Sequence, residues 1–463
     1  MANPSETMSA KNVASTFHIA DRASHNFLHM RQWEGFEKSL GNPWTLQVNL
    51  SIAENALMHQ DIVDFIGKHS KVDPVHHLTY GSGPKGSPRL RKALASFLNS
   101  TFKPRESVRH EDILIMAGVT SVIDALAWTL CNDGEGIIIP QPFYTGFAVD
   151  LPTRSRAVIV PALFQTLDEY KGFDDVFDPA MSIKAMEKAL QDAEARGVKV
   201  KAVLLTNPHN PLGRCYSADA IKEVASFCGR HKLHFISDEI YANSVFENPE
   251  APSPVPFISA LALDLTDRID SKFLHVTYGA SKDFCANGLR LGMLHTRNEG
   301  LKAVVAGTSM LGWPPYVIQD IWASMLEDEA YTNNFFAKNQ RLLAEQYAIA
   351  TRFLDDHGIP YYKNSNAGMF IWIDLRQYLS GKDTTSLALH RLTAEERKEY
   401  QRRELEISTQ CFANGVAIAL GTNFFTEELG WFRLSFTAAP EALTIGLERM
   451  VKALQDVERT GWN

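Results

Sequence analysis

Cysteine is scarce in this sequence of 463 residues. The five cysteines are an odd number for disulfide pairing: Cys131, Cys215, Cys228, Cys285 and Cys411. No two of them have the Cys-x-x-Cys spacing of many zinc and redox sites. So few thiols exclude a disulfide framework and favour reduced cysteines. We therefore expect a cytoplasmic protein without a metal centre.

Long apolar runs are also missing. No stretch is apolar over the length that a bilayer-spanning helix needs, and the polar residues 1–15 lack the apolar core of a signal peptide. The final residues, 460–463, match no common targeting signal. The net charge is −8 and the pI is near 6.0, without a basic stripe. These absences argue against membrane and nucleic-acid partners.

Short apolar segments alternate with helix-like segments between residues 112 and 277. The expected strands are 113–116, 136–139, 157–160, 203–206, 234–237 and 273–277, and the expected helices are 122–130, 181–196 and 218–231. This alternation predicts an α/β fold whose large domain has a mostly parallel sheet with helices on both faces. Ligands of such sheets bind beyond the carboxyl ends of the strands.

The pattern differs on either side of this region. Helices are expected at 57–70, from Ser87-Pro88 onwards, at 325–356 and at 441–460. Strands are expected at 44–50, 367–374 and 431–436, and the highly charged residues 380–406 are expected to form a solvated insertion with helical turns. These elements predict a smaller α+β domain. We expect an N-terminal arm and part of the small domain in 1–55, the large domain in 56–315 and the small C-terminal domain in 316–463.

A lysine follows small residues in the stretch 278–290. Lys282 comes after the expected strand 273–277, and Arg290 lies eight positions later. A lysine amine condenses with an aldehyde, and an arginine pairs with a phosphate through two hydrogen bonds. Pyridoxal 5′-phosphate carries both groups, so this pair is typical of a pyridoxal-phosphate site. The alternative is a solvated lysine on the surface.

Two other strand ends carry groups that suit the same cofactor. Gly118-Val119-Thr120 opens a helix, where backbone N–H groups, the Thr120 hydroxyl and the helix dipole can hold a phosphate. Asp238 follows the expected strand 234–237. A carboxylate there can keep a pyridinium nitrogen protonated, although an aspartate at such a position also caps helices.

Three side chains in turns complete the pattern. Tyr144 lies in a loop bounded by proline and glycine, where it either stacks on a flat ring or packs within the loop. Asn210 lies in 206–213, a turn stiffened by two Asn-Pro pairs. Asn210 and Tyr241 can both donate a hydrogen bond to a phenolate oxygen, and a plain turn is the alternative for Asn210.

Together these segments resemble fold-type I pyridoxal-phosphate enzymes of the class I/II aminotransferase family. The intervals of 28 positions from Asn210 to Asp238, three from Asp238 to Tyr241 and eight from Lys282 to Arg290 match that family. The resemblance covers about residues 45–455. It is closer to 1-aminocyclopropane-1-carboxylate (ACC) synthase and its relatives, because of four segments: Ala53-Glu54-Asn55, Asn207 to Gly213, Ser281-Lys282-Asp283 and Gly430 to Arg433.

The resemblance implies a role for each matching residue. Lys282 forms the internal aldimine and moves the α-proton, and Asp238 pairs with the pyridinium nitrogen. Asn210 and Tyr241 hold the ring oxygen, and Tyr144 stacks on the ring. The phosphate is held by Gly118, Val119, Thr120 and Arg290, and Arg433 binds the substrate α-carboxylate. Glu54 is either a substrate contact at the pocket edge or an ordinary charge at a helix start.

The sequence departs from the family at two places. Gly279 stands where the family usually has a serine that binds the phosphate. The loop 80–88 is longer and richer in glycine than in the plant enzymes. The resemblance implies a homodimer in which this loop reaches the partner's site, through Tyr80 on the phosphate or through Lys85 on phosphate or substrate.

The residues leave the reaction open after the α-proton is removed from an amino-acid substrate. We expect ACC-synthase-like chemistry, that is β- or γ-elimination or C–S cleavage, as in some fungal secondary metabolism. The alternative is an aminotransferase that passes the amino group to a 2-oxo acid. A non-catalytic scaffold would lose Lys282 or Asp238, and both are present.

Overall fold

The computed structural model describes residues 48–380 and 387–460, together with seven residues between Ser15 and Met30. Nearly all of the predicted N-terminal arm, the start of the strand predicted at 44–50, and residues 381–386 of the predicted insertion lie outside the described residues. None of the described helices is long and apolar enough to cross a membrane. All five cysteines are buried and free.

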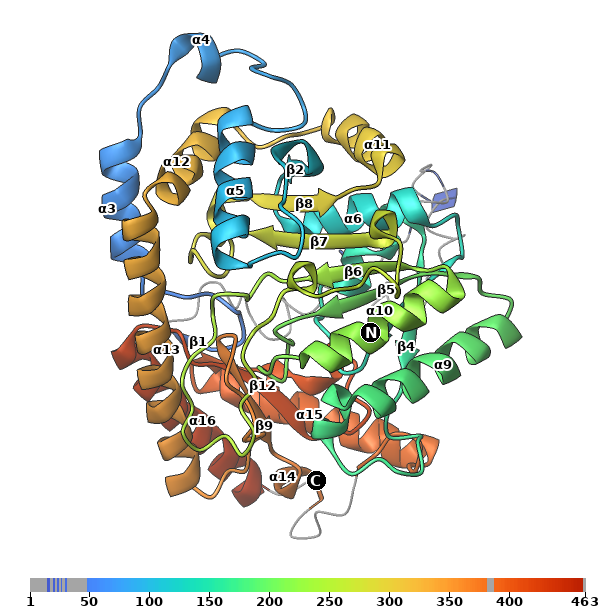
Figure 1. The fold of residues 1–463 in the computed structure, drawn as a ribbon. Helices are drawn as coiled ribbons and strands as arrows, with labels where there is room; N and C mark the ends of the chain where they lie inside the picture. The colour runs from blue at the N-terminus through green and yellow to red at the C-terminus, as the bar shows by residue number, and fades with distance from the viewer. Residues whose placement is uncertain are drawn as a thin grey trace.

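A seven-stranded sheet forms the centre of the large domain (Figure 1). Its strands are β2 (Ile113–Met116), β3 (Gly136–Pro140), β4 (Val158–Ala162), β5 (Val200–Thr206), β6 (His234–Asp238), β7 (Leu274–Gly279) and β8 (Gly292–Thr296), in the order β2-β8-β7-β6-β5-β3-β4. Only β8 runs antiparallel to its neighbours. The six predicted strands are confirmed, and the sheet is mostly parallel, as expected.

The prediction missed β8. Its sequence begins with a glycine and contains a histidine, so it does not read as a run of β-branched residues. Gly292 is required there because a Cβ would overlap the backbone of Gly118, the residue that precedes helix α6 (Val119–Leu130). A close approach of two backbone segments thus explains why the strand lacks a typical strand residue at that position.

Helices cover both faces of this sheet, because each strand buries alternate side chains in opposite directions. Val203 and Leu205 of β5 join the cluster under α9 and α10, whereas Ala202 and Leu204 join the cluster under α6. The helices are α3 (His59–His69), α4 (Pro74–His77), α5 (Pro88–Thr101), α6 (Val119–Leu130), α7 (Phe147–Asp150), α8 (Pro152–Ser155), α9 (Pro179–Ala195), α10 (Ala218–His231), α11 (Glu299–Ser309) and α12 (Tyr316–Glu327).

The helix starts follow local capping rules. Ser87 accepts a hydrogen bond from the Leu90 N–H and Pro88 is the first helical residue, as predicted for α5. The single helix predicted at 325–356 is wrong. Asp328 ends α12, and its side chain accepts from the Tyr331 N–H to start α13 (Glu329–Asp356), so an N-cap divides the run into two helices.

The small domain is built on a three-stranded sheet, β11 (Ala419–Leu420), β12 (Trp431–Ser435) and β9 (Phe370–Asp374). The remaining elements are α14 (Gln377–Ser380), α15 (Ala394–Ala413), β10 (Val416–Ala417), α16 (Pro440–Thr460) and the N-terminal β1 (Val48–Asn49). β1 pairs in parallel with β10, so the N-terminal segment joins this domain, as expected.

The charged segment 380–406, predicted as a solvated insertion with helical turns, leads into one continuous helix, α15, whose later part is buried. Thr393 and Glu396 form a capping box that starts α15. Ile407 and Cys411 of this helix are buried in the small-domain core, beside α16. The charges on the outer face concealed the narrow apolar stripe of α15.

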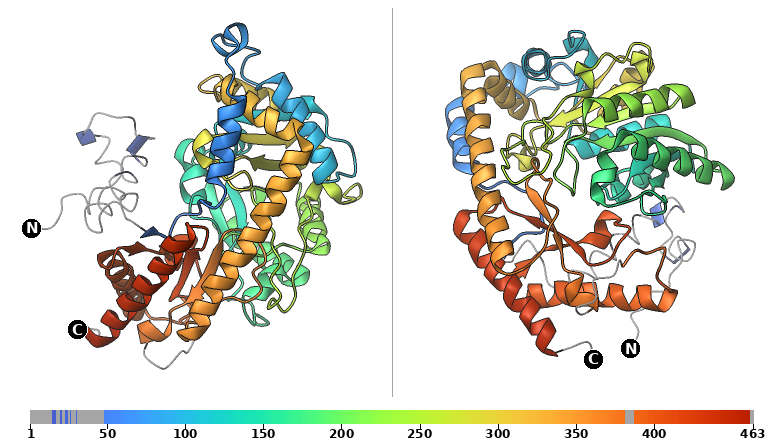
Figure 2. Two further views of the ribbon diagram at one scale, coloured as in Figure 1. Left: turned by 90° about the vertical axis from the view of Figure 1, so that its left-hand side faces the viewer. Right: turned by 60° about the horizontal axis from the view of Figure 1, so that its bottom comes forward.

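The long helix α13 connects the two domains (Figure 2). Phe335 and Phe336 near its start pack in one cluster with α5, α12 and the large sheet. Leu343 and Tyr347 further along it pack with the small-domain strands. The boundary at 315/316 stays a prediction, but α12 lies against α5 of the large domain rather than against the small sheet.

Candidate active site

A cavity of about 300 Å³ lies beyond the carboxyl ends of β5, β6 and β7. Parallel strands bring the residues that follow them to one edge of the sheet, which is where ligands of such sheets bind. Nine of the thirteen predicted site residues line this cavity: Glu54, Val119, Thr120, Tyr144, Asn210, Asp238, Tyr241, Lys282 and Arg290. Segments more than two hundred positions apart therefore meet in one site.

Lys282 lies in the wall of this cavity. Its Nζ donates a hydrogen bond to the carbonyl oxygen of Ala53 at 2.6 Å. Burial, together with the charge of Arg433, lowers the pKa of Lys282 to about 8, while Glu54 acts in the opposite direction. A larger fraction of this amine is thus neutral near neutral pH than in an ordinary lysine, which favours its action as a nucleophile or a base.

The loop that carries Lys282 is anchored by the next residue. The Asp283 carboxylate accepts hydrogen bonds from the backbone N–H of Asn243 at 2.7 Å and from the Ser244 hydroxyl at 2.7 Å. Burial raises the pKa of Asp283 to about 6. These bonds tie the lysine loop to the turn that follows Tyr241. The sequence indicated Lys282 but assigned no role to Asp283.

Asp238 is the last residue of β6 and is buried. Its Oδ1 accepts a hydrogen bond from the Thr277 hydroxyl of β7 at 2.8 Å. Burial raises the pKa of Asp238 to about 6, and the hydrogen bond from Thr277 opposes that rise. A buried carboxylate at this position gains most from a cationic partner, because an ion pair compensates for the lost hydration.

Arg433 on β12 points at the cavity residue Asn210. Its Nη1 donates to Asn210 Oδ1 at 3.1 Å, and its Nη2 donates to the Ser51 carbonyl at 2.7 Å. Because arginine only donates, the Asn210 oxygen faces Arg433, and its amide N–H group is left for another acceptor. The Arg433 guanidinium lies over the rings of Phe370 and Phe424, at 5.0 and 4.6 Å from their centres.

Arg433 itself is not among the residues that line the cavity within the described chain. Its side chain is only 4% exposed, and its Nε has no hydrogen-bond partner among the described residues. Burial lowers the pKa of Arg433 but leaves it well above neutral pH. A carboxylate is the natural partner for a buried guanidinium with an unused donor.

An anion-binding corner lies at the start of α6. Gly118 has φ +85°, and a Cβ there would overlap the guanidinium of Arg290. Arg290 donates from Nη1 to the Asn287 carbonyl at 2.9 Å and has its other nitrogens available beside this helix start. The first N–H groups of a helix have no partner within the helix, so Val119, Thr120 and Arg290 together offer several donors to one phosphate.

Gly279 fits its place for a steric reason. A Cβ at this position would lie 2.6 Å from the Leu291 carbonyl oxygen and 3.2 Å from Val119. The tight pairing of β7 with β8 therefore leaves no room for the serine that the family usually has. Ser281 lines the cavity two positions later and presents another hydroxyl there.

The prediction missed an acid in the same corner, Asp150. This residue ends α7 and lines the cavity, where it accepts a hydrogen bond from Thr120. Burial and the neighbouring carboxylates of Asp124 and Asp238 raise the pKa of Asp150 to about 7, against the effect of Thr120 and Arg290. Its position six residues after Tyr144, in the same loop-helix unit, was the available signal.

Tyr144 and Tyr241 line the cavity from two sides. The ring of Tyr144 lies at 5.4 Å from the ring of Phe147, edge to face. A Cβ on Gly146 would overlap the Tyr144 ring, so this glycine lets the ring fold back over its own turn. Tyr241 is buried, with its ring perpendicular to that of Phe370 at 5.5 Å.

Two predicted contacts lie outside the cavity, on the loop 80–88. Tyr80 is 83% exposed, with its ring near Trp313 at 6.1 Å, and Lys85 is exposed as well. Neither residue lines the cavity of its own chain. Glu54, in contrast, lies at the cavity edge, where its Oε1 accepts from the Asn287 amide at 2.6 Å.

These groups fit pyridoxal 5′-phosphate: a half-buried lysine, a carboxylate for a ring nitrogen, and a helix start with an arginine for a phosphate. The fold and the site define the class of pyridoxal-phosphate enzymes with the aspartate-aminotransferase fold. The family model described as aminotransferase class I and II matches residues 46–450, so this chain belongs to that family. Enzymes of the family use pyridoxal phosphate as their cofactor.

Individual relatives point in two directions. The chain is 28% identical to "1-aminocyclopropane-1-carboxylate synthase 2" of Cucurbita pepo, over 96% of this chain and 87% of that protein. It is 31% identical to "Probable aminotransferase sirI" of Leptosphaeria maculans, over 89% of this chain and 92% of that protein. A tetra mutant of Thermus thermophilus aspartate aminotransferase shares the fold, with a TM-score of 0.66 at 19% identity over 89% of this chain and 98% of its own.

Proposed function

We propose that the protein is an ACC-synthase-like lyase, which removes the α-proton of an amino acid and expels a β- or γ-substituent, often sulfur. The observation that carries this proposal is the setting of Lys282, a half-buried amine that donates to the Ala53 carbonyl of the Ala53-Glu54-Asn55 segment and whose pKa is lowered to about 8. The similarity to the Cucurbita pepo ACC synthase over nearly the whole chain supports it.

Each residue of the cavity has a task in this proposal. Pyridoxal phosphate, when bound, supplies the electron sink that stabilises a carbanion at the substrate α-carbon. The neutral Nζ of Lys282 takes up the proton from that carbon, and Asp238 holds a proton on the ring nitrogen. Asn210 and Tyr241 would donate hydrogen bonds to the ring oxygen of the bound cofactor, and Tyr144 would stack on its ring.

Substrate binding depends on Arg433 in this proposal. Its unused Nε and the buried guanidinium suit the α-carboxylate of an amino acid, in a paired, two-hydrogen-bond contact. Glu54, held by Asn287 at the cavity edge, is placed to contact the substrate amine or side chain. Val119, Thr120 and Arg290 would hold the phosphate, with the carboxyl of Asp150 bonded to Thr120 beside them.

An aminotransferase is the second candidate, which the 31% identity to the Leptosphaeria maculans protein favours. Incubation with S-substituted and common amino acids, with and without a 2-oxo acid, separates the two by mass spectrometry. A lyase releases its leaving group without any acceptor. Product formation that requires the 2-oxo acid would establish the aminotransferase and reject the lyase.

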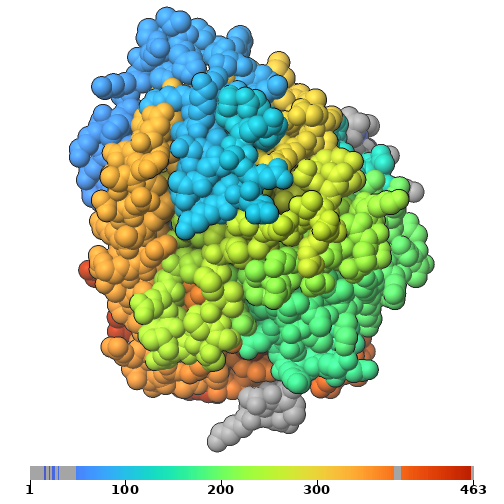
Figure 3. Space-filling model, in the orientation of Figure 1, coloured from blue at the N-terminus to red at the C-terminus, as the bar shows by residue number. Residues whose placement is uncertain are grey.

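We also propose a homodimer in which the loop 80–88 completes the partner's site. The segment that carries α4 protrudes from the body of the molecule, at the top of Figure 3. It exposes the apolar side chains of Val72, Val75 and Leu78, and Leu311 is 85% exposed. A protruding segment with this much exposed apolar area suits burial against a second copy. Equilibrium sedimentation that finds an active monomer would refute the dimer.

A cytoplasmic location is our proposal for the cell. Five buried, free thiols are compatible with a reducing compartment. Microscopy of a fluorescent fusion tests this directly, and a signal confined to an organelle would reject it.

A further inference from the structure

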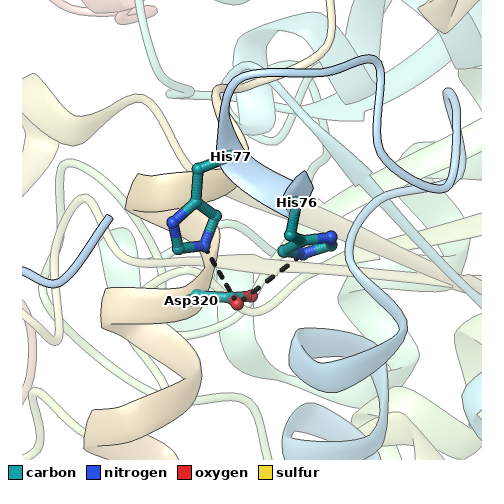
Figure 4. A group of neighbouring side chains, drawn as sticks. All are labelled: His76, His77 and Asp320. Carbon is teal, nitrogen blue, oxygen red and sulfur yellow. Dashed lines mark hydrogen bonds and ion pairs between the residues drawn. The ribbon is translucent and has the colours of Figure 1, made fainter. Parts of the chain in front are cut away.

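Two histidines and an aspartate converge on the protruding segment, apart from the cavity residues (Figure 4). His76 and His77 end α4, and Asp320 lies on α12. The Nε2 atoms of His76 and His77 lie 3.7 and 3.3 Å from the same oxygen, Oδ2 of Asp320. The three atoms all lie within 4.8 Å of one another. Two neighbouring imidazoles therefore face one carboxylate oxygen.

The spacing of these atoms suits a tetrahedral metal ion. Bonds of about 2.0–2.1 Å from zinc to nitrogen or oxygen place neighbouring ligand atoms about 3.3 Å apart. The two nitrogen-to-oxygen distances of 3.3 and 3.7 Å are close to that value. Two imidazoles and one carboxylate are ligands that divalent zinc and cobalt accept, with a fourth position left for water.

Asp320 also has the support that metal-binding carboxylates usually have. The Ser87 hydroxyl donates to its other oxygen, Oδ1, at 2.7 Å. This bond fixes the carboxylate and leaves Oδ2 for the ion. Ser87 is the N-cap of α5, so the site would join α4, α5 and α12.

Two contacts in the metal-free site must change before a metal ion can bind. The Asp73 N–H donates to His77 Nδ1 at 3.0 Å, so in the neutral ring Nε2 carries the proton and donates to Asp320. If Nε2 binds a metal ion, the proton of the neutral ring must move to Nδ1. Nδ1 can then no longer accept the hydrogen bond from the Asp73 N–H, so that bond must break. The second contact is an ion pair, because Arg89 Nη1 lies 3.9 Å from Asp320 Oδ2 and its charge repels a cation.

Arg89 can move away from Asp320 and keep its shorter ion pair with Glu327. Its Nη2 lies 2.6 Å from Glu327, and its side chain is 45% exposed. We propose that His76, His77 and Asp320 bind one divalent transition-metal ion of the zinc type, which fixes the segment 73–87 on α12. The ion is structural in this proposal, so it has no part in the reaction at Lys282.

The test uses the whole dialysed protein, with its cofactor, and Co²⁺ as the probe. Four-coordinate Co²⁺ gives visible d–d bands, which Zn²⁺ then removes by competition. We expect one saturable site per chain in the unchanged protein. His76→Ala and Asp320→Asn should weaken binding about tenfold or more, since each removes one ligand. Asn keeps the hydrogen bond from Ser87, so Asp320→Asn is the gentler change.

A matched control is His110→Ala, which removes an exposed histidine that pairs with Glu111 instead. It should bind Co²⁺ as the unchanged protein does. Absence of a saturable band in the unchanged protein would overturn the proposal. The same holds if both ligand variants, still folded by circular dichroism, bind Co²⁺ as tightly as the control.

Discussion

The cavity and the protruding segment differ in how far their polar side chains are exposed to solvent. In the cavity, Asp238 is buried and Lys282 and Asp150 are half-buried, and the loss of hydration moves the pKa of each towards neutrality. On the segment, Tyr80 and Lys85 are exposed and lie outside the cavity of their own chain. The titratable groups of the cavity therefore come from one chain, and Tyr80 and Lys85 contribute nothing to the cavity of that chain.

The largest effect is expected from Lys282→Ala. Loss of the amine removes both the covalent anchor and the base, so turnover should fall by about three orders of magnitude or more. The visible absorption band that pyridoxal phosphate gives with the unchanged protein should vanish as well. Lys68→Ala, at an exposed lysine of α3, is the control and should keep both. A Lys282→Ala protein that kept the band would place the anchor elsewhere.

Arg433→Lys is expected to have the next largest effect. The substitution keeps a positive charge but removes the planar, two-donor group beside Asn210. KM for the amino-acid substrate should rise about 10- to 100-fold, with a smaller change in kcat. The exposed Arg105→Lys is the matched control. An unchanged KM would show that Arg433 serves the fold alone.

Asp150→Asn tests the acid in the phosphate corner. The pKa of Asp150 is raised to about 7, so its carboxyl is protonated below that pH and negative above it. The negative form repels the phosphate, so the unchanged protein should lose cofactor affinity relative to Asp150→Asn as the pH rises from 6 to 8. We expect a difference of several-fold at pH 8, on the order of 1 kcal/mol.

Cofactor titration followed by absorbance measures that ratio at each pH. Protonation of the phosphate and of Lys282 affects both proteins alike and cancels. Asp133→Asn, at an exposed carboxylate paired with Arg156, is the control. A ratio that does not change with pH would remove Asp150 from the phosphate corner.

Tyr80→Ala should give the smallest effect. Because the side chain is 83% exposed, the free energy of unfolding should change by less than about 0.5 kcal/mol. If the loop reaches the partner's phosphate, cofactor affinity should still fall a few-fold. Thermal unfolding and cofactor titration distinguish the two quantities. An unchanged cofactor affinity would show that Tyr80 does not reach the phosphate in the partner's site.

The sequence predicted the sheet and most of the cavity because both depend on local patterns. Strand ends followed by Asp238, Lys282 and the 206–213 turn put functional groups at one edge, whatever the details of packing. Two features depended on contacts that no local pattern contains: β8, whose glycine is set by the close approach of Gly118, and the burial of α15. The helix break at Asp328 has a local cause, an N-cap bond from the Tyr331 N–H, which the prediction missed.

Asp150 and Asp283 show a similar limit within the site. An isolated aspartate has no distinctive spacing, and each gains its importance from partners far away in the sequence, Thr120 for one and Asn243 for the other. Gly279 was recognised as a departure, but its reason is the carbonyl of Leu291, the residue directly before β8, which the sequence did not predict.

The account depends most on Lys282 as the residue that binds the cofactor. Borohydride reduction of the protein with pyridoxal phosphate, followed by proteolysis and mass spectrometry, locates the attachment directly. We predict one pyridoxyl group per chain, on Nζ of Lys282. A pyridoxyl group on another lysine, or none after saturation with the cofactor, would contradict the account.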